Sequence, residues 1–291
     1  MANVGAAELT REAVSAGRAA VRSLDDGRKV STDDDAALFV DQRGIAPLMH
    51  LAGCELPSLS EADIRDPWEG FDITDGAWRW KEILPQTRRC AYGKFLRGRG
   101  FFISWRLFPA FYRLRGRPQN AADGPSDHAG DFADGLLGRL EWAVLEAVDE
   151  RGPIDSRRLW RELKRTFGGN RSRFEQALTT LQAGFRVMVA GGDLAGWSMH
   201  RWELVERQAP AGLLRQLPDQ ECARQALVRQ YTANTVVCTT REIAGFFGWS
   251  PGETADLCER LRAAGALREV TVDGWKGTWW STAGSPYAGT S

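Results

Sequence analysis

The stretch SPGETADLCERLRAAGALREVTVDGWKGTWWS, residues 250–281, predicts a helix followed by a β-hairpin. Ser250 is a suitable N-cap, Pro251 takes the first helical position, and Gly265 follows the last turn. The pair Asp273-Gly274 is a strong hairpin signal, which predicts strands over 266–272 and 275–281 joined by two residues. Helices predicted at 221–232 and 240–247 complete the order helix, helix, helix, hairpin, which is typical of a winged helix.

The same order occurs earlier in the chain. Helices predicted at 136–149, 156–167 and 171–182 precede strands at 185–189 and 197–204. The segment NAADGPSDHAG, residues 120–130, is small and polar and predicts a linker. We therefore predict an α+β fold, mainly helical, built from tandem winged-helix units, each a helix-turn-helix with a β-hairpin wing. The expected domains are an N-terminal winged-helix-like domain at 1–119, a second winged helix at 131–210 and a third at 211–291.

The N-terminal part carries clear helix signals. Residues 8–24 read as one helix that ends at the turn Asp25-Asp26-Gly27. Thr32 is a good N-cap for a second helix, whose first turn holds three aspartates where the helix dipole favours acids. Ser58 to Glu61 form a capping-box pattern that predicts a short helix.

Positive charge gathers between Arg79 and Arg117, although the formal net charge of the chain is zero. This segment holds eleven Lys or Arg against one acid, Glu82, and aromatic residues are interleaved with the cations. Such a composition is typical of a groove that follows phosphates and stacks bases. We expect a DNA channel lined by Trp80, Lys81, Tyr92, Lys94, Arg97 and Arg99. The alternatives are that the cations pair with the acidic segments on either side, and that rings such as Trp78 and Phe95 are core.

The third helix of each repeat differs in charge. Arg171 and Arg173 stand on the face opposite the apolar positions of the first, which predicts phosphate contacts from a recognition helix. The corresponding helix of the second repeat carries Glu253, Asp256 and Glu259, and we expect it to pack rather than to read DNA.

Composition excludes several classes of protein. Five scattered cysteines without a CxxC pair and three distant histidines argue against a metal site or a disulfide framework, so no metal or cofactor is expected. No apolar run approaches the roughly 20 residues of a membrane span, and the N-terminus does not read as a signal peptide. We expect a cytoplasmic protein without a membrane partner. No long heptad pattern is present, and a monomer is the expectation.

Several motifs resemble the AlkZ and YcaQ type of winged-helix DNA glycosylases, and more specifically a shorter AlkZ-related branch. They are LPSLSEA (56–62), WRWKEILPQ (78–86), AYGKFLRGRGFFIS (91–104), LFPAFYRLRG (107–116) and RSRFEQALTTLQ (171–182). The resemblance covers most of residues 33–282, with YGKFLRG as its most specific block. It implies three winged-helix units around duplex DNA. In the active members it also implies monofunctional, metal-free excision of alkylated or crosslinked bases by hydrolysis of the N-glycosidic bond.

Those active members carry Gln, a hydrophobic residue, and then Gln or Asp near the N-terminus, and the third residue positions the attacking water. The comparable stretch here is Phe39-Val40-Asp41-Gln42. Asp41 matches the acidic form of the motif, Phe39 replaces its first glutamine, and Gln42 stands one residue beyond it, turned by about 100° on a helix. Asp41 and Gln42 are the catalytic candidates. The alternatives are a core role for Phe39, and for Asp41 a carboxylate that pairs with Arg43 or with a cation of the basic segment.

Three functions stay open from the sequence. The first is a glycosylase that leaves an abasic product, and its carboxylate would stabilise the oxocarbenium-like centre. The second is a DNA-binding protein without catalysis, a transcription regulator or a lesion sensor, which the missing glutamine favours. The third is a protein-interaction scaffold, which the clustering of cations with aromatic rings disfavours.

Overall fold

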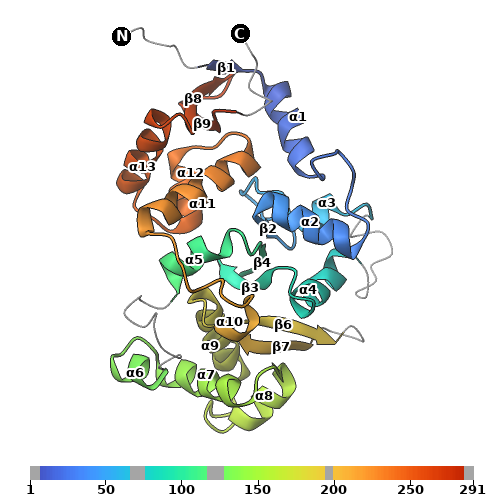
Figure 1. Ribbon diagram of the computed structural model, residues 1–291, viewed down its shortest axis with the longest axis vertical. Coiled ribbons are helices and arrows are strands. Elements are labelled where there is room, and N and C mark those ends of the chain that lie inside the picture. Colours follow the sequence, from blue (N-terminus) through green and yellow to red (C-terminus); the bar gives the residue numbers. More distant parts are fainter. Residues whose placement is uncertain (1–6, 66–75, 117–127, 194–198, 285–291) are drawn as a thin grey trace.

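The computed structural model describes residues 7–65, 76–116, 128–193 and 199–284. Three units follow one another along the long axis of the molecule (Figure 1). The first unit, α2 to α5 with the sheet β2-β4-β3, lies in the middle; the second, α6 to α10 with the sheet β5-β7-β6, lies at one end. The third unit, α11 to α13 with the sheet β1-β8-β9, lies at the other end. The predicted class, α+β and mainly helical, is confirmed.

The first unit begins where the sequence predicts. Thr32 and Ser58 both close capping boxes, with Asp35 and Glu61 as the reciprocal partners. The unit comprises α2 (Asp33–Arg43), β2 (Ile45–Pro47), α3 (Leu59–Ala62), α4 (Gly76–Gln86), β3 (Ala91–Leu96), β4 (Arg99–Ile103) and α5 (Phe108–Arg115). Strand β4 pairs antiparallel with both of its neighbours.

The second unit has the predicted order of helix, helix, helix and hairpin. Its elements are α6 (His128–Ala133), α7 (Arg139–Arg151), β5 (Ile154–Asp155), α8 (Ser156–Leu163), α9 (Arg171–Ala183), β6 (Val187–Asp193), β7 (Met199–Leu204) and α10 (Val205–Gln208). The short strand β5 pairs with β7 and completes a three-stranded antiparallel sheet. Most of the predicted linker, residues 120–127, lies outside the described residues.

The third unit departs from the prediction in its hairpin. Its elements are α11 (Gln220–Thr235), α12 (Thr240–Phe247), α13 (Pro251–Ala263), β8 (Leu267–Val272) and β9 (Trp279–Thr282). The chain turns at Asp273-Gly274, but the second strand begins only at Trp279, so the expectation of a two-residue connection is wrong. Trp275 leaves the strand path because its ring packs 4.8 Å from that of Trp279, under the guanidinium of Arg18.

The N-terminal segment is the second departure. The predicted helix over 8–24 is instead a strand, β1 (Ala7–Leu9), followed by α1 (Arg11–Val21) with Thr10 as its N-cap. Strand β1 pairs in parallel with β8, and Leu9 and Val14 share an apolar cluster with Val270. The apolar side chains of residues 7–21 therefore pack on the third unit, while Arg18 also pairs with Glu55 of the middle unit.

The units share their cores. Trp80 and Tyr92 of the first unit belong to the same apolar cluster as Trp202 of the second. On the other side, Phe101 of β4 packs edge-on at 5.9 Å from Phe246 of α12. The middle unit is thus held on both sides, which fixes its β3–β4 hairpin relative to α9 and α12. No helix in the described part of the chain is long and apolar enough to cross a membrane.

Candidate nucleic-acid interface

The β3–β4 hairpin presents the clearest positive surface. Arg97 and Gly98 form its two-residue turn, with φ angles of 51° and 65°, the left-handed conformation that such tight turns require. Lys94, Arg97 and Arg99 are exposed. Their side chains make no hydrogen bond or ion pair with any other described residue. Three cations on one short hairpin are therefore available to a polyanion.

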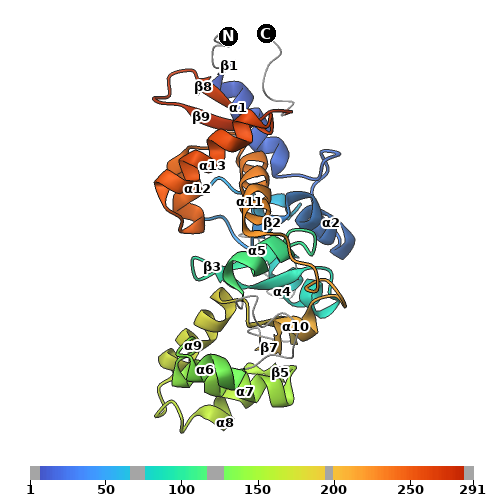
Figure 2. The same cartoon turned by 60° about the vertical axis from the view of Figure 1, so that its left-hand side comes forward.

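Neighbouring units hold this hairpin in place. The backbone N–H of Lys94 donates to Oε1 of Gln182, on α9, at 2.7 Å. That glutamine is itself buried and donates to the carbonyl of Leu178, so its amide is oriented by its own helix. Figure 2 shows the hairpin projecting between α12 above and α9 below.

Three residues expected in the DNA channel are buried instead. Trp80 is 1% exposed, Lys81 2% and Tyr92 5%, so none of the three can contact DNA in this structure, and that prediction is wrong for them. Trp80 donates from Nε1 to Asp33 at 3.0 Å, and Tyr92 packs against Phe102 at 4.7 Å between ring centroids. Burial also raises the pKa of the Tyr92 hydroxyl. On a half-buried helix or strand, one face points into the core. Trp80 and Lys81 lie on the inner face of α4, and Tyr92 lies on the inner face of β3.

Lys81 belongs to a buried polar cluster between the first and second units. Its Nζ lies 2.9 Å from the carboxylate of Glu82, which is 2% exposed, and Nδ1 of His200 on β7 lies 3.1 Å from the same carboxylate. Gly192 is required beside it, because a Cβ there would stand 2.1 Å from Glu82 Oε2. The cluster is a structural joint and offers no surface to DNA.

Part of the basic segment pairs with acids, as the alternative interpretation expected. Arg79 binds Asp33 and Arg89 binds Asp34, both in the first turn of α2. The hydrogen bond from Arg79 is the largest influence that lowers the pKa of Asp33 below its ordinary value. These pairs attach α4 and the residues after it to α2, so their cations do not add to the free positive surface.

A second basic surface surrounds the α8–α9 turn, and only its Arg171 and Arg173 were predicted from the sequence. From Ser156 to Arg173 the chain carries seven Lys or Arg against one acid, Glu162. Lys164 and Arg165, in the turn between α8 and α9, are exposed, as are Arg171 and Arg173 at the start of α9. A charge count in a sliding window would have found this turn.

The two predicted recognition-helix cations differ in freedom. Arg171 donates to Glu175 at 2.7 Å, and its guanidinium lies over the rings of Trp160 and Phe174, so it is already held by its own unit. Arg173 has no side-chain partner among the described residues, and its backbone N–H is capped by Asn170. Arg173 is the better candidate for a phosphate contact.

The candidate catalytic segment forms the end of α2. Phe39 is 0% exposed, which confirms the interpretation of this residue as core. Asp41 is exposed, and its carboxylate makes no hydrogen bond or ion pair with any described residue. Arg43 binds Asp25 instead, and Arg106 donates to the backbone carbonyl of Asp41 at 3.0 Å rather than to its side chain. The carboxylate of Asp41 is therefore free of side-chain and backbone partners among the described residues and is accessible to a ligand.

Gln42 is used by the fold. Its Oε1 accepts from the backbone N–H of Asp25 at 3.1 Å, in the turn that follows α1. This bond directs the amide towards the N-terminal segment, so Gln42 is a weaker candidate than Asp41 for contact with a substrate. No group of three or more His, Cys, Asp or Glu in the described part of the chain could hold a metal ion.

Comparisons with known proteins agree with this architecture. The family model described as AlkZ related matches residues 30–248. Among solved structures, the Streptomyces sahachiroi DNA glycosylase AlkZ matches with a TM-score of 0.60 and 13% sequence identity, over 93% of this chain and 70% of that chain. Comparison with curated proteins finds no match. At such low identity the structural match establishes a shared fold, and function has to be argued from the site.

Proposed function

The chain belongs to the AlkZ-related family, and on this basis we propose that it binds duplex DNA and hydrolyses the N-glycosidic bond of alkylated or crosslinked bases. A solved structure with this fold is that of a DNA glycosylase. The observation that carries the proposal is the uncommitted carboxylate of Asp41 on α2, at the position that the family motif gives to an acid.

The chemistry follows from the charge that develops during base loss. The bond between C1′ and the base nitrogen breaks, and the base leaves with the bonding electron pair. An alkylated purine is positively charged beforehand, so it leaves as a neutral molecule. The sugar is left with oxocarbenium character, which a nearby carboxylate stabilises electrostatically. Water then adds to C1′ and gives its proton to the carboxylate, which leaves an abasic site.

Binding would use the two positive surfaces. Lys94, Arg97 and Arg99 of the hairpin, with Arg173 and the α8–α9 turn, supply cations for phosphates on units that share one core. Phosphate contacts of this kind position a protein on duplex DNA without reading its sequence. That property suits an enzyme that searches for damage.

A single-turnover assay tests the catalytic proposal. Purified wild type, Asp41→Asn and Asp34→Asn are incubated with duplex oligonucleotides that carry N7-alkylated guanine, and abasic sites are cleaved with alkali. We expect strand breaks with the wild type and Asp34→Asn, and a loss of at least about a hundredfold in rate with Asp41→Asn. Asp34 is the matched control because it is an exposed aspartate on the same helix. Equal rates for all three proteins would remove Asp41 from the mechanism.

A non-catalytic DNA-binding function is the second candidate, and Phe39 favours it. The side chain that replaces the motif's first glutamine, Phe39, is fully buried and does not face a substrate in this structure. In that case none of the three proteins yields breaks, and Asp41→Asn binds the lesion duplex as tightly as the wild type.

A further inference from the structure

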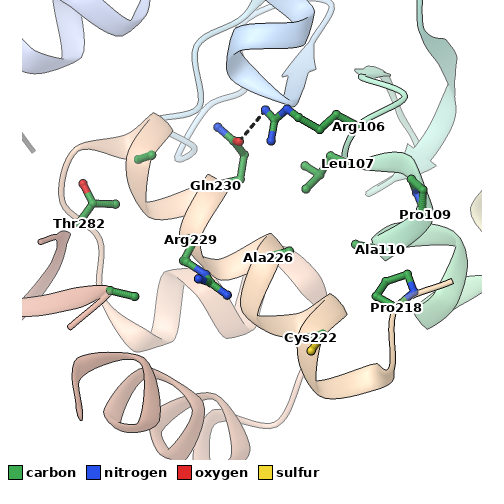
Figure 3. Close-up of a pocket in the computed structure, with 12 residues that line it drawn as sticks. Arg106, Leu107, Pro109, Ala110, Pro218, Cys222, Ala226, Arg229, Gln230 and Thr282 are labelled. Atoms are coloured by element: carbon green, nitrogen blue, oxygen red, sulfur yellow. Dashed lines mark hydrogen bonds between the residues drawn. The ribbon is translucent and has the colours of Figure 1, made fainter. Parts of the chain in front are cut away.

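A pocket of about 620 Å³ lies between the first and third units, away from the β3–β4 hairpin. One wall is the segment leading into α5, with Leu107 and Ala110, and the opposite wall is α11, with Ala226 and Ala233. Figure 3 shows the two helices facing each other across it, with Thr282 at the far side. The volume lies within the range of roughly 300 to 1,000 Å³ that small-molecule sites occupy.

The charged groups of the pocket are all positive. Arg106 and Arg229 come from opposite walls, and none of the twelve lining residues is acidic. Arg106 donates from Nη2 to Oε1 of Gln230 at 3.1 Å and to the carbonyl of Asp41. Arg229 is held by Gln225 of its own helix, at 3.4 Å and 3.3 Å. Neither guanidinium pairs with a carboxylate of any described residue, so both positive charges are unneutralised.

We propose that this pocket binds a small molecule with an apolar body and an anionic group, the body between α5 and α11 and the anion at one of the two guanidinium groups, Arg106 or Arg229. Small alanine and proline side chains leave room for a flat or branched body, and burying it against them is favourable. Guanidinium groups hold a carboxylate or sulfonate by charge-assisted hydrogen bonds, two of them when the geometry is bidentate.

Cys222 gives the pocket an internal reporter. It lines the pocket and is exposed, whereas Cys54, Cys90, Cys238 and Cys258 are buried. Its pKa is raised by the hydrogen bond and charge of Asp219, so alkylation is slow enough to follow at neutral pH. A molecule in the pocket would shield this thiol and leave the other four unchanged.

The probe is 1-anilinonaphthalene-8-sulfonate, which joins an aromatic body to a sulfonate. Its uncharged counterpart is N-phenyl-1-naphthylamine. We expect saturable binding of the sulfonate at one site, about tenfold or more weaker in Arg106→Ala/Arg229→Ala. The affinity of the uncharged probe should fall much less in the same double variant. Arg241→Ala, which removes an exposed cation outside the pocket, is the matched control.

Alkylation of Cys222 by iodoacetamide, followed by peptide mass spectrometry, locates the probe in the wild-type protein. We expect the rate at Cys222 to fall in proportion to occupancy. This measurement needs no variant, so it holds even if loss of Arg106 disturbs the end of α2. The proposal is overturned if the sulfonate does not bind, if bound sulfonate leaves Cys222 unprotected, or if the folded double variant binds it as tightly as the wild type.

Discussion

At the scale of single residues, Lys81 and Glu82 form a buried ion pair in which each charge depends on the other for compensation. Burial alone would raise the pKa of Glu82, but His200 and Lys81 outweigh it and hold this pKa below its ordinary value. Glu82→Gln would leave the Lys81 ammonium buried without a counter-charge. We expect a loss of about 3 kcal/mol in the free energy of unfolding, measured by urea denaturation at pH 7. Glu150→Gln, at the exposed pair with Arg151, should cost under about 1 kcal/mol.

The pH dependence of the same variant has a definite sign. A carboxyl with a lower pKa in the folded state stabilises the fold above its unfolded pKa, about 4.3, and this contribution is lost as the pH falls through the folded pKa. The difference in unfolding free energy between wild type and Glu82→Gln should therefore narrow as the pH falls below about 4. A difference that is equally large at pH 3 would contradict the assigned pKa shift.

The same cluster shows what sequence can and cannot predict about a site. Charge counting identified the basic segment, but it could not separate Lys81, which is buried beside Glu82, from Lys94, which is exposed thirteen residues later. The deciding partner, His200, comes from another unit. The burial of Phe39 could be predicted, because an aromatic side chain on a half-buried helix packs into the core whichever residues surround it.

At the scale of elements, the β3–β4 hairpin carries the expected contact with DNA. Removing three exposed cations in Lys94→Ala/Arg97→Ala/Arg99→Ala should weaken duplex binding, and the slope of log K against log salt should fall in magnitude by roughly 2 to 3. Fluorescence anisotropy with a labelled duplex between 50 and 200 mM salt measures both the affinity and its salt dependence. The control, Arg139→Ala/Arg215→Ala/Arg241→Ala, removes the same charge from exposed positions elsewhere. Equal losses in both variants would mean that net charge, not the hairpin, governs binding.

The turn of this hairpin is explained by its local sequence. A Gly after Arg97, between two apolar runs, allows the left-handed turn that joins the strands. The Asp273-Gly274 turn offered an equally strong signal, yet the strand after it begins late. There the ring of Trp275 packs against Trp279 and Arg18, and Trp275 is not part of the ladder between β8 and β9. Local sequence could not predict this contact, because Arg18 belongs to a helix more than 250 residues away.

At the scale of the whole molecule, the chain closes on itself. Strand β1 extends the sheet of the last unit, so the N-terminal residues pack beside the C-terminal hairpin, as Figure 1 shows. No periodicity in three residues could predict this pairing, because its energy comes from a strand edge and an apolar cluster formed by residues 236–272. Sequence patterns predict the order of the units along the chain, but the pairing of β1 with β8 is known only from the structure.

Deletion of residues 1–9 tests that closure. The backbone N–H of Asp273 donates to the carbonyl of Leu9 at 2.9 Å, and Leu9 is 3% exposed, so the deletion removes both a hydrogen bond and a buried side chain. We expect amide exchange at Asp273 to accelerate by about tenfold or more, together with a lower melting temperature. A shorter deletion, residues 1–6, keeps β1 and should leave Asp273 protected. If the longer deletion also leaves it protected, β8 holds its conformation without β1, and the N-terminal strand contributes nothing to the stability of the third unit.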